Sequence, residues 1–225
     1  RGLGDVYKRQ GYISTSGSGN ITIGSSGNKA NSISLEAGSS ATASYAFLKS
    51  IDGNISLYSS SDISMRSGTG ADSICYLMTT SGHINITGES DLSLNGNTGA
   101  DSNCFIHSSN LGGISLNVDG NISITAGSSG TQSRSYIGDA SGDSGSGDIA
   151  ITCGGDIAIT GGNLSGSGAN DAWIRTNSGA LTANVTGDIT LTGGVVNPAT
   201  EAAAYIYTFS GALTINANNI TMTPG

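Results

Sequence analysis

The sequence predicts an all-β fold, namely a three-sided, single-stranded parallel β-helix (β-solenoid) with about 32 residues per turn. Three observations predict it. One short strand pattern recurs at a nearly constant period, two further strand patterns recur at the same period, and the three follow one another in a fixed order. A period of this size is typical of repeat architectures in which equivalent turns stack on one another. We therefore expect a single continuous repeat array.

The first pattern reads approximately Asx-Ile-Ser/Thr-aliphatic. It begins at Ile21, Ile55, Ile84, Ile114, Ile149, Leu181 and Leu213. The step between successive copies is shortest from Ile55 to Ile84 and longest from Ile114 to Ile149, and the mean period is about 32 residues. Aliphatic and polar residues alternate within each copy, and a period of two indicates a strand with one buried face.

The second pattern shows the same alternation and follows closely after the first. It begins at Ile33, Ile63, Leu92, Ile122, Ile157, Ile189 and Ile220. Short Gly-Asx pairs such as Gly120-Asn121, Gly155-Asp156 and Gly187-Asp188 separate the two strands. Glycine and Asx residues tolerate a left-handed backbone, so we expect a sharp corner with that conformation at these pairs.

The third pattern, small-aromatic-aliphatic, leads back to the next copy of the first. It is centred on Ile13, Leu48, Leu77, Ile106, Ile137, Ile174 and Ile206. The next first strand follows after a short connection of nearly constant length, except after Ile137, where the connection is longer. Three strands therefore close one turn. The stretch between the second and third patterns varies most, so insertions should collect at one edge.

Stacking of equivalent strands explains why the side chains repeat so regularly. In a parallel coil, like positions lie about 4.8 Å apart and form ladders. One turn offers about five inward aliphatic residues, worth roughly 1.5 to 3 kcal/mol each, against about 1 to 2 kcal/mol of backbone entropy per residue. A single turn cannot fold alone, so each must template the next. A propeller is disfavoured because its blades need four antiparallel strands in about 40 to 45 residues.

Composition and charge restrict the class of protein further. Glycine supplies 36 residues, proline only 2 and charged side chains 11%, yet the aliphatic residues are evenly spaced, which argues against disorder. The net charge of −8 argues against a nucleic-acid partner or an anionic membrane surface, which would select a basic stripe. No apolar run approaches the roughly 20 residues that span a bilayer. We therefore expect no membrane insertion in this segment.

The ends of the sequence differ in character from its body. Residues 1–10 stand outside the pattern and contain Arg1, Lys8 and Arg9, three of the eight basic residues. The segment 3–10 resembles translated adapter sequence, so residues 1–10 are expected to be a non-native or unstructured flank. Residues 11–225 are expected to form about six to seven turns. Since the repeat is already under way at Gly11 and still running at Gly225, we expect a fragment of a longer array.

Several copies of the repeat resemble a known family. The segments GDITLTGG at 187–194, GNISL at 53–57 and GNISITAG at 120–127 are similar to repeats of filamentous-haemagglutinin-like adhesins. Autotransporter passenger proteins are a near-equal match. The resemblance covers roughly residues 11–225 and implies a right-handed parallel β-helix, secretion to the bacterial surface with outer-membrane association, and a role in adhesion as a rigid stalk.

An aromatic residue precedes the central aliphatic residue of every third pattern. These residues are Tyr12, Phe47, Tyr76, Phe105, Tyr136, Trp173 and Tyr205. In a coil they stack in one line, on the face opposite Leu77 and Ile106. If those aliphatic residues point inward, the row faces outward, where Tyr76, Phe105, Tyr136, Trp173 and Tyr205 are a candidate binding site for glycans or proteins. The alternatives are a structural ladder covered by the edge loops, or an aromatic core with the register reversed.

Two of the three cysteines occupy equivalent positions. Cys75 and Cys104 lie two residues before Leu77 and Ile106, so they should be adjacent in space and point inward. They are either stacked small hydrophobic residues or a disulfide, since the ladder spacing falls within the usual Cα separation. Cys153 has no equivalent elsewhere, and without paired Cys-x-x-Cys spacing there is no zinc signal.

Other candidate motifs are weak. Residues 142–145 read Gly-Asp-Ser-Gly, but catalytic triads are recognised by geometry, and His83 and His107 lie at the ends of other strands. Asp139, Asp143 and Asp148 could hold calcium, yet the nonapeptide calcium repeat is missing. We therefore expect no catalytic residue, metal or cofactor.

The function expected from these observations is structural or adhesive rather than enzymatic. The segment would supply reach and stiffness to a secreted or surface-exposed protein, with host or environmental glycans or proteins as partners and neighbouring repeats of the same chain as its structural contacts. The alternative is a carbohydrate-active β-helix, such as a polysaccharide lyase or a phage tailspike. Such enzymes need carboxylates and basic groups that converge on one groove.

Overall fold

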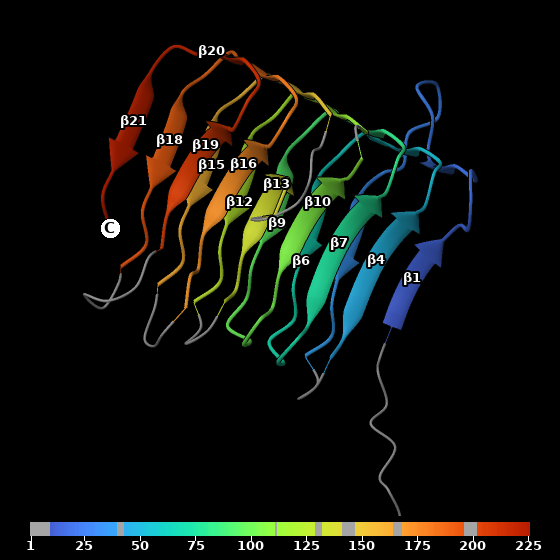
Figure 1. The fold of residues 1–225 in the computed structure, drawn as a ribbon. Coiled ribbons are helices and arrows are strands. Elements are labelled where there is room, and N and C mark those ends of the chain that lie inside the picture. The colour runs from blue at the N-terminus through green and yellow to red at the C-terminus, as the bar shows by residue number, and fades with distance from the viewer. Residues whose placement is uncertain are drawn as a thin grey trace, which may run out of the picture.

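The computed structural model describes residues 10–39, 43–110, 112–128, 132–140, 147–163, 168–195 and 202–225. These residues form a β-solenoid in which the chain winds forward and places one strand on each of three sheets per turn (Figure 1). Within these ranges there is no helix, and therefore none long and apolar enough to cross a membrane. The predicted parallel β-helix is confirmed.

Each sheet contains seven strands, one from each turn. Sheet A consists of β1 (Gln10–Ser14), β4 (Tyr45–Ser50), β7 (Ile74–Thr79), β10 (Cys104–Ser108), β13 (Ser135–Gly138), β16 (Ala172–Thr176) and β19 (Ala204–Thr208). Sheet B consists of β2 (Ile21–Ile23), β5 (Ile55–Ser59), β8 (Ile84–Gly88), β11 (Ile114–Val118), β14 (Ile149–Cys153), β17 (Leu181–Val185) and β20 (Leu213–Asn216). Sheet C consists of β3 (Ile33–Glu36), β6 (Ile63–Arg66), β9 (Leu92–Asn95), β12 (Ile122–Thr125), β15 (Ile157–Thr160), β18 (Ile189–Thr192) and β21 (Ile220–Thr223).

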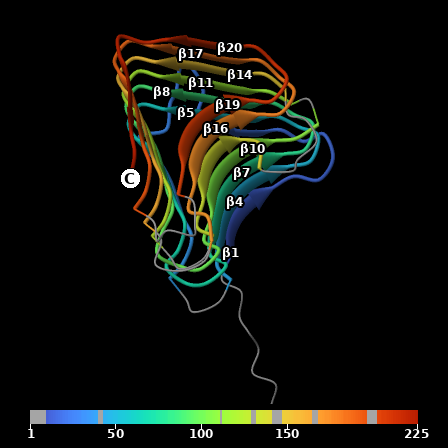
Figure 2. The same ribbon diagram turned by 60° about the vertical axis from the view of Figure 1, so that its left-hand side comes forward.

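The strands pair in parallel and in register, so that repeated sequence positions become neighbours. Ile55 pairs with Ile84, which is among the shortest separations in sequence, and Ser135 pairs with Ala172, which is the longest. Both separations are close to one period of the repeat. Figure 2 shows the result, with sheet B along the top of the view and sheet A facing the viewer. The three sequence patterns therefore correspond to sheets B, C and A.

The core runs along the axis of the solenoid and is built from alternate residues of every strand. In one turn, Ile55 and Leu57 of sheet B, Ile63 and Met65 of sheet C, and Leu77 of sheet A are fully buried. Each such side chain stabilises the fold by roughly 1.5 to 3 kcal/mol. Because the next turn places the same residue types at the same positions, the core is continuous.

The Gly-Asx corners between sheets B and C use a mechanism that the sequence analysis did not anticipate. The backbone N–H of Asp156 donates to Asn121 Oδ1, and the N–H of Asp188 donates to Asp156 Oδ1, both at 2.8 Å. Each Asx side chain thus accepts a hydrogen bond from the equivalent residue one turn later. We call such a column an Asx ladder. It satisfies backbone donors that the bend removes from the sheet pattern.

The prediction of a left-handed backbone at these corners is wrong. Neither Gly155 nor Gly187 has a positive φ, and Asn121 and Asp156 do not either. Glycine is required there because of space: a Cβ on Gly155 would overlap Asn121 Oδ1, and one on Gly187 would overlap Asp156 Oδ1. At these two positions the Asx ladder therefore needs a glycine one residue before the donating N–H, and the close approach of the preceding turn leaves no room for a Cβ.

The corners between sheets A and B are held by buried hydroxyl groups. Ser50 Oγ donates to the Gly19 carbonyl at 2.8 Å and accepts from Gly53 N at 3.0 Å. Thr79 Oγ1 does the same one turn later, with the Gly53 carbonyl at 2.9 Å and Gly82 N at 3.1 Å. The last inward residue of these sheet A strands is therefore polar, yet fully hydrogen-bonded.

The solenoid begins one residue earlier than the sequence indicated. β1 starts at Gln10, which pairs with Tyr45, so Gln10 belongs to the repeat and not to the flank predicted for residues 1–10. Residues 1–9 lie outside the described ranges.

Candidate functional site

The seven aromatic residues form one continuous stack on the outer face of sheet A, and we call it the aromatic row. Successive ring centroids are 4.5 to 5.6 Å apart, and the ring planes are within 2° to 8° of parallel. Strand alternation places Leu77 and Ile106 in the core with no exposed surface, so the row faces outward as expected. The alternative of an aromatic core with a reversed register is excluded.

The stacking geometry limits what the aromatic row can bind. Each of the five inner rings presents both faces to the rings of the neighbouring turns, so only its edges remain for solvent, whereas a sugar stacks on a free ring face. The end rings, Tyr12 and Tyr205, each have one ring partner among the described residues. The exposed fraction falls from 57% at Tyr12 to 8% at Tyr136 and 1% at Trp173. Trp173 Nε1 also donates to the Asp139 carbonyl at 2.8 Å. This geometry favours the structural ladder around Tyr136 and Trp173, and a binding role for the row stays a prediction.

Charged side chains accompany the buried part of the aromatic row. The Arg134 guanidinium lies 5.9 Å from the centroid of the Trp173 ring, within the range of a cation–π interaction. Burial raises the pKa of Tyr205, Asp171 raises it further, and Arg175 opposes the shift. Burial likewise raises the pKa of Tyr76. Both phenols therefore keep their protons at neutral pH.

His107 joins two turns beside the row. Its Nδ1 lies 2.8 Å from the Gly138 carbonyl and its Nε2 lies 2.6 Å from Ser109 Oγ. Because a carbonyl can only accept, Nδ1 of the neutral ring carries the proton and the Ser109 hydroxyl donates to Nε2. A catalytic serine donates its hydroxyl proton to a histidine base in the same direction. However, His107 is only 6% exposed and its ring is held between β10 and the end of β13. We assign the pair a structural role.

The cysteines are adjacent and inward, as expected, but they are free thiols. Cys75 pairs in register with Cys104, and both are fully buried. The disulfide considered for this pair is therefore not formed in the structure. Burial raises the pKa of the Cys104 thiol, as does its hydrogen bond with Cys75, and Cys75 Sγ also donates to the Leu35 carbonyl at 3.3 Å. Cys153 is buried too, which raises its pKa.

The weaker motifs do not converge on one site. Residues 142–145 and Asp143 lie outside the described ranges. Asp139 is buried and accepts from Asn177 N at 2.7 Å through Oδ2, whereas Asp148 is exposed at the start of sheet B. Among the described residues, no group of three or more His, Cys, Asp and Glu side chains is arranged to hold a metal ion.

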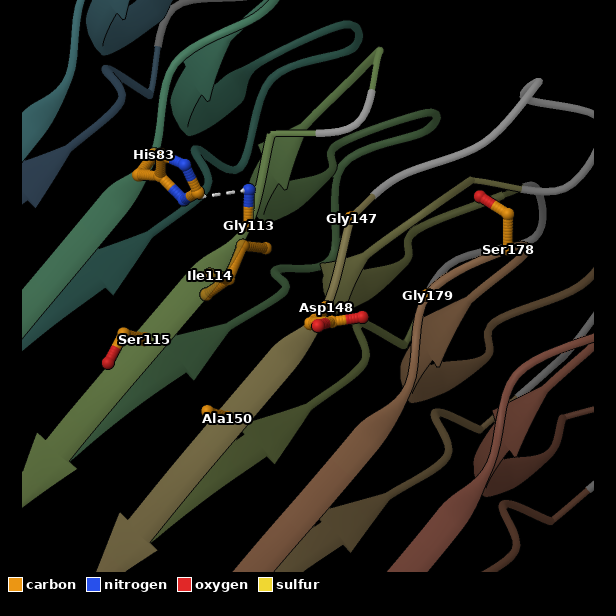
Figure 3. Close-up of a pocket in the computed structure, with 9 residues that line it drawn as sticks. All are labelled: His83, Gly113, Ile114, Ser115, Gly147, Asp148, Ala150, Ser178 and Gly179. Atoms are coloured by element: carbon orange, nitrogen blue, oxygen red, sulfur yellow. Dashed lines mark hydrogen bonds between the residues drawn. The ribbon is translucent and has the colours of Figure 1, made fainter.

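A depression of about 490 Å³ lies at the corner where the chain enters sheet B. It extends over four successive turns, and its polar side chains are His83, Asp148, Ser115 and Ser178 (Figure 3). His83, Asp148 and Ser178 are exposed. Glycine backbone forms much of its floor, at Gly113, Gly147 and Gly179.

This depression arises where an Asx ladder is interrupted. Asn54 N donates to Asn20 Oδ1 and His83 N to Asn54 Oδ1, both at 2.8 Å. Gly113 N then donates to His83 Nδ1 at 3.1 Å. Gly113 has no side chain to offer the following turn, so the ladder stops there. It resumes when Ala180 N donates to Asp148 Oδ1 at 2.8 Å.

Sequence reasoning missed this site, although a signal for it exists. The residues just before the seven strands of sheet B are Asn20, Asn54, His83, Gly113, Asp148, Ala180 and Ala212. Reading down this column shows the loss of the side-chain acceptor at Gly113, directly before the longest step between copies of the first pattern. Local motifs indicated His83 only as a catalytic candidate and Asp148 only as a calcium ligand, and not the two as members of one column.

Comparison with known proteins does not assign this chain to a family. No family model, curated protein or solved structure matches the chain.

Proposed function

We propose that this chain is a rigid structural segment of a secreted or surface-exposed adhesive protein, and that it is not an enzyme. The observation that carries the proposal is the unbroken register of all three sheets over seven turns, with one hydrophobic core along the axis. Such a stack resists bending because every turn is hydrogen-bonded to the next along three faces. A structure of this kind supplies reach, while its loops and corners remain free for contacts.

The surface chemistry supports adhesion through specific contacts rather than binding to an anionic surface through charge alone. The chain is acidic, with a net charge of −8, and its exposed corner residues are mainly small and polar. The two groups that best resemble catalytic residues, His107 and Asp139, are buried in hydrogen bonds that join neighbouring turns. We therefore propose glycans or proteins of a host or environmental surface as partners, and an extracellular or cell-surface location.

Two measurements test the two halves of this proposal separately. For stiffness, a single molecule is held between its termini in optical tweezers, and its length is expected to stay constant until discrete unfolding steps occur. Continuous lengthening at low force would contradict the stalk role. For adhesion, beads that carry the folded chain are expected to remain on glycan-coated or cell-coated surfaces under flow. Retention no better than that of beads with the unfolded chain would refute it.

A further inference from the structure

We infer that the corner depression around Gly113 binds a neutral, polyhydroxylated ligand, namely sugar units of a glycan. The inference rests on the adhesive half of the proposed function and names its site and ligand class. It concerns the depression lined by His83, Gly113, Asp148 and Ser178, and not the aromatic row, whose five inner rings have both faces covered by neighbouring rings.

The regularity of the solenoid is broken at this corner in two ways. Gly113 replaces the acceptor side chain of the Asx ladder. In addition, the connection from β13 to β14 spans 139–148, whereas the connection from β7 to β8 spans only 80–83. Packing between turns selects the residue at most positions of this repeat. A position that departs from the repeat pattern is therefore a candidate for a functional site.

The interruption leaves hydrogen-bonding groups of both kinds at the surface. The Asp148 N–H has no acceptor among the described residues, because Gly113 stands where an Asx side chain would be. Asp148 Oδ1 is engaged by Ala180 N, which leaves Oδ2 for a ligand. His83 is exposed and accepts through Nδ1, so Nε2 of the neutral ring carries the proton. The depression therefore offers a donor and a carboxylate acceptor at Asp148, and a second donor two turns away at His83.

This combination is complementary to neighbouring hydroxyl groups. A vicinal diol can accept from an N–H and donate to a carboxylate at the same time, whereas an anion would be repelled by Asp148 and by the overall charge of −8. The exposed Ala150 and the glycine floor present backbone and a methyl group to the C–H face of a sugar ring. From His83 to Ser178 the depression extends over three turn spacings, about 14 Å, which is longer than one sugar unit.

Conservative variants can remove the ligand contacts and leave the fold intact. Asp148→Asn keeps an oxygen for the Ala180 N–H but loses the carboxylate. His83→Asn keeps an acceptor for the Gly113 N–H, as Asn54 does one turn earlier, but loses the Nε2 donor. Asp188→Asn is the matched control, because Asp188 belongs to the ladder at the opposite corner and accepts from Asn219 Nδ2 at 2.8 Å.

The experiment is a titration of the ¹⁵N-labelled chain with methyl glycosides of neutral hexoses and N-acetylhexosamines, and with short neutral oligosaccharides. The expected result is a saturable shift of the Asp148 and Gly113 amide signals. Affinity is expected to fall about tenfold in Asp148→Asn and His83→Asn and to be unchanged in Asp188→Asn.

Three outcomes would overturn the inference. They are no shift with any of these sugars, equal affinity in the two corner variants and the parent chain, or shifts confined to the residues of the aromatic row. None of them bears on the stiffness measured by tweezers, so failure at this site is distinguishable from failure of the stalk role.

Discussion

At the scale of single residues, the space left by the preceding turn decides which corner positions must be glycine. A Cβ on Gly82 would overlap the Gly53 carbonyl, which is backbone and cannot move aside. Gly27 is the opposite case, since nothing lies within 4 Å of the Cβ that would be added there. The many glycines of this sequence therefore differ in what they contribute to stability.

This difference predicts contrasting effects of one substitution. Gly82→Ala is expected to lower the free energy of unfolding by about 1 to 3 kcal/mol, because the backbone must shift to admit the methyl group. Gly27→Ala is expected to change it by less than about 0.5 kcal/mol. Urea denaturation of the two variants checks this. Equal effects would show that close approach of the turns does not select glycine.

The Asx ladder predicts a stabilising substitution. Ala180 offers no side-chain acceptor to the Ala212 N–H of the next turn, whereas Asp148 offers one to Ala180. Ala180→Asn should supply it and raise the free energy of unfolding by about 0.5 to 1.5 kcal/mol. Ala212→Asn is the control, because none of the described residues lies one turn later with an N–H to donate to position 212. If both variants behave alike in thermal unfolding, the ladder does not contribute as argued.

Thiol chemistry tests the inward position of the cysteines. Cys75, Cys104 and Cys153 are buried, and burial raises the pKa of Cys104 and Cys153, so the reactive thiolate is disfavoured. Native protein is expected to resist alkylation at mildly alkaline pH and to take up three labels after denaturation. Rapid labelling of the native chain would contradict this burial, and a count of one label after denaturation without reductant would reveal a Cys75–Cys104 disulfide.

At the scale of elements, the outer face of sheet A shows how a ladder of side chains stabilises neighbouring strands. Tyr136 and Trp173, on β13 and β16, stack with centroids 4.5 Å apart, and Trp173 stacks with Tyr205 on β19 at 5.6 Å. Tyr12 on β1 has one ring partner among the described residues, Phe47 at 4.8 Å, and is largely exposed. The contribution of the row should therefore be greatest where two rings enclose a third.

Alanine substitutions along the row test this gradient. Trp173→Ala is expected to lower the free energy of unfolding by about 3 to 5 kcal/mol, because it removes a buried ring between two others. Tyr12→Ala is expected to lower it by less than about 1 kcal/mol. Guanidinium denaturation followed by circular dichroism measures both. If Trp173→Ala lowers the free energy of unfolding only slightly, the row does not act mainly as a structural ladder, and a binding role becomes the better explanation.

The strands could be predicted from local sequence patterns, whereas the contacts made at the corners could not. Period-two alternation locates Ile55 and Ile63 at the starts of β5 and β6, because burial of alternate residues is a local property of the sequence. The bond from Gly113 to His83 joins residues one full turn apart, and its importance depends on which side chain is missing. The burial of Trp173 depends in the same way on a long-range contact with Asp139. Local patterns carry no information about such contacts.

At the scale of the whole molecule, the solenoid is a one-dimensional stack in which each turn contacts chiefly its neighbours. Most residues that are far apart in sequence become close because they occupy equivalent positions in adjacent turns, as Thr22 and Ser56 do. The distance between equivalent positions should therefore grow in proportion to the number of turns between them. This property holds for a parallel, in-register coil and fails for an antiparallel array.

The most direct test of this account is a series of distances between spin labels on the outer face of sheet B. One label replaces Thr22, and the second replaces Ser115, Thr182 or Thr214, which lie three, five and six turns later. An in-register solenoid predicts narrow distributions that increase by about 4.8 Å per turn, to about 29 Å for the last pair. Distances that do not rise with the number of turns would contradict parallel stacking of equivalent strands.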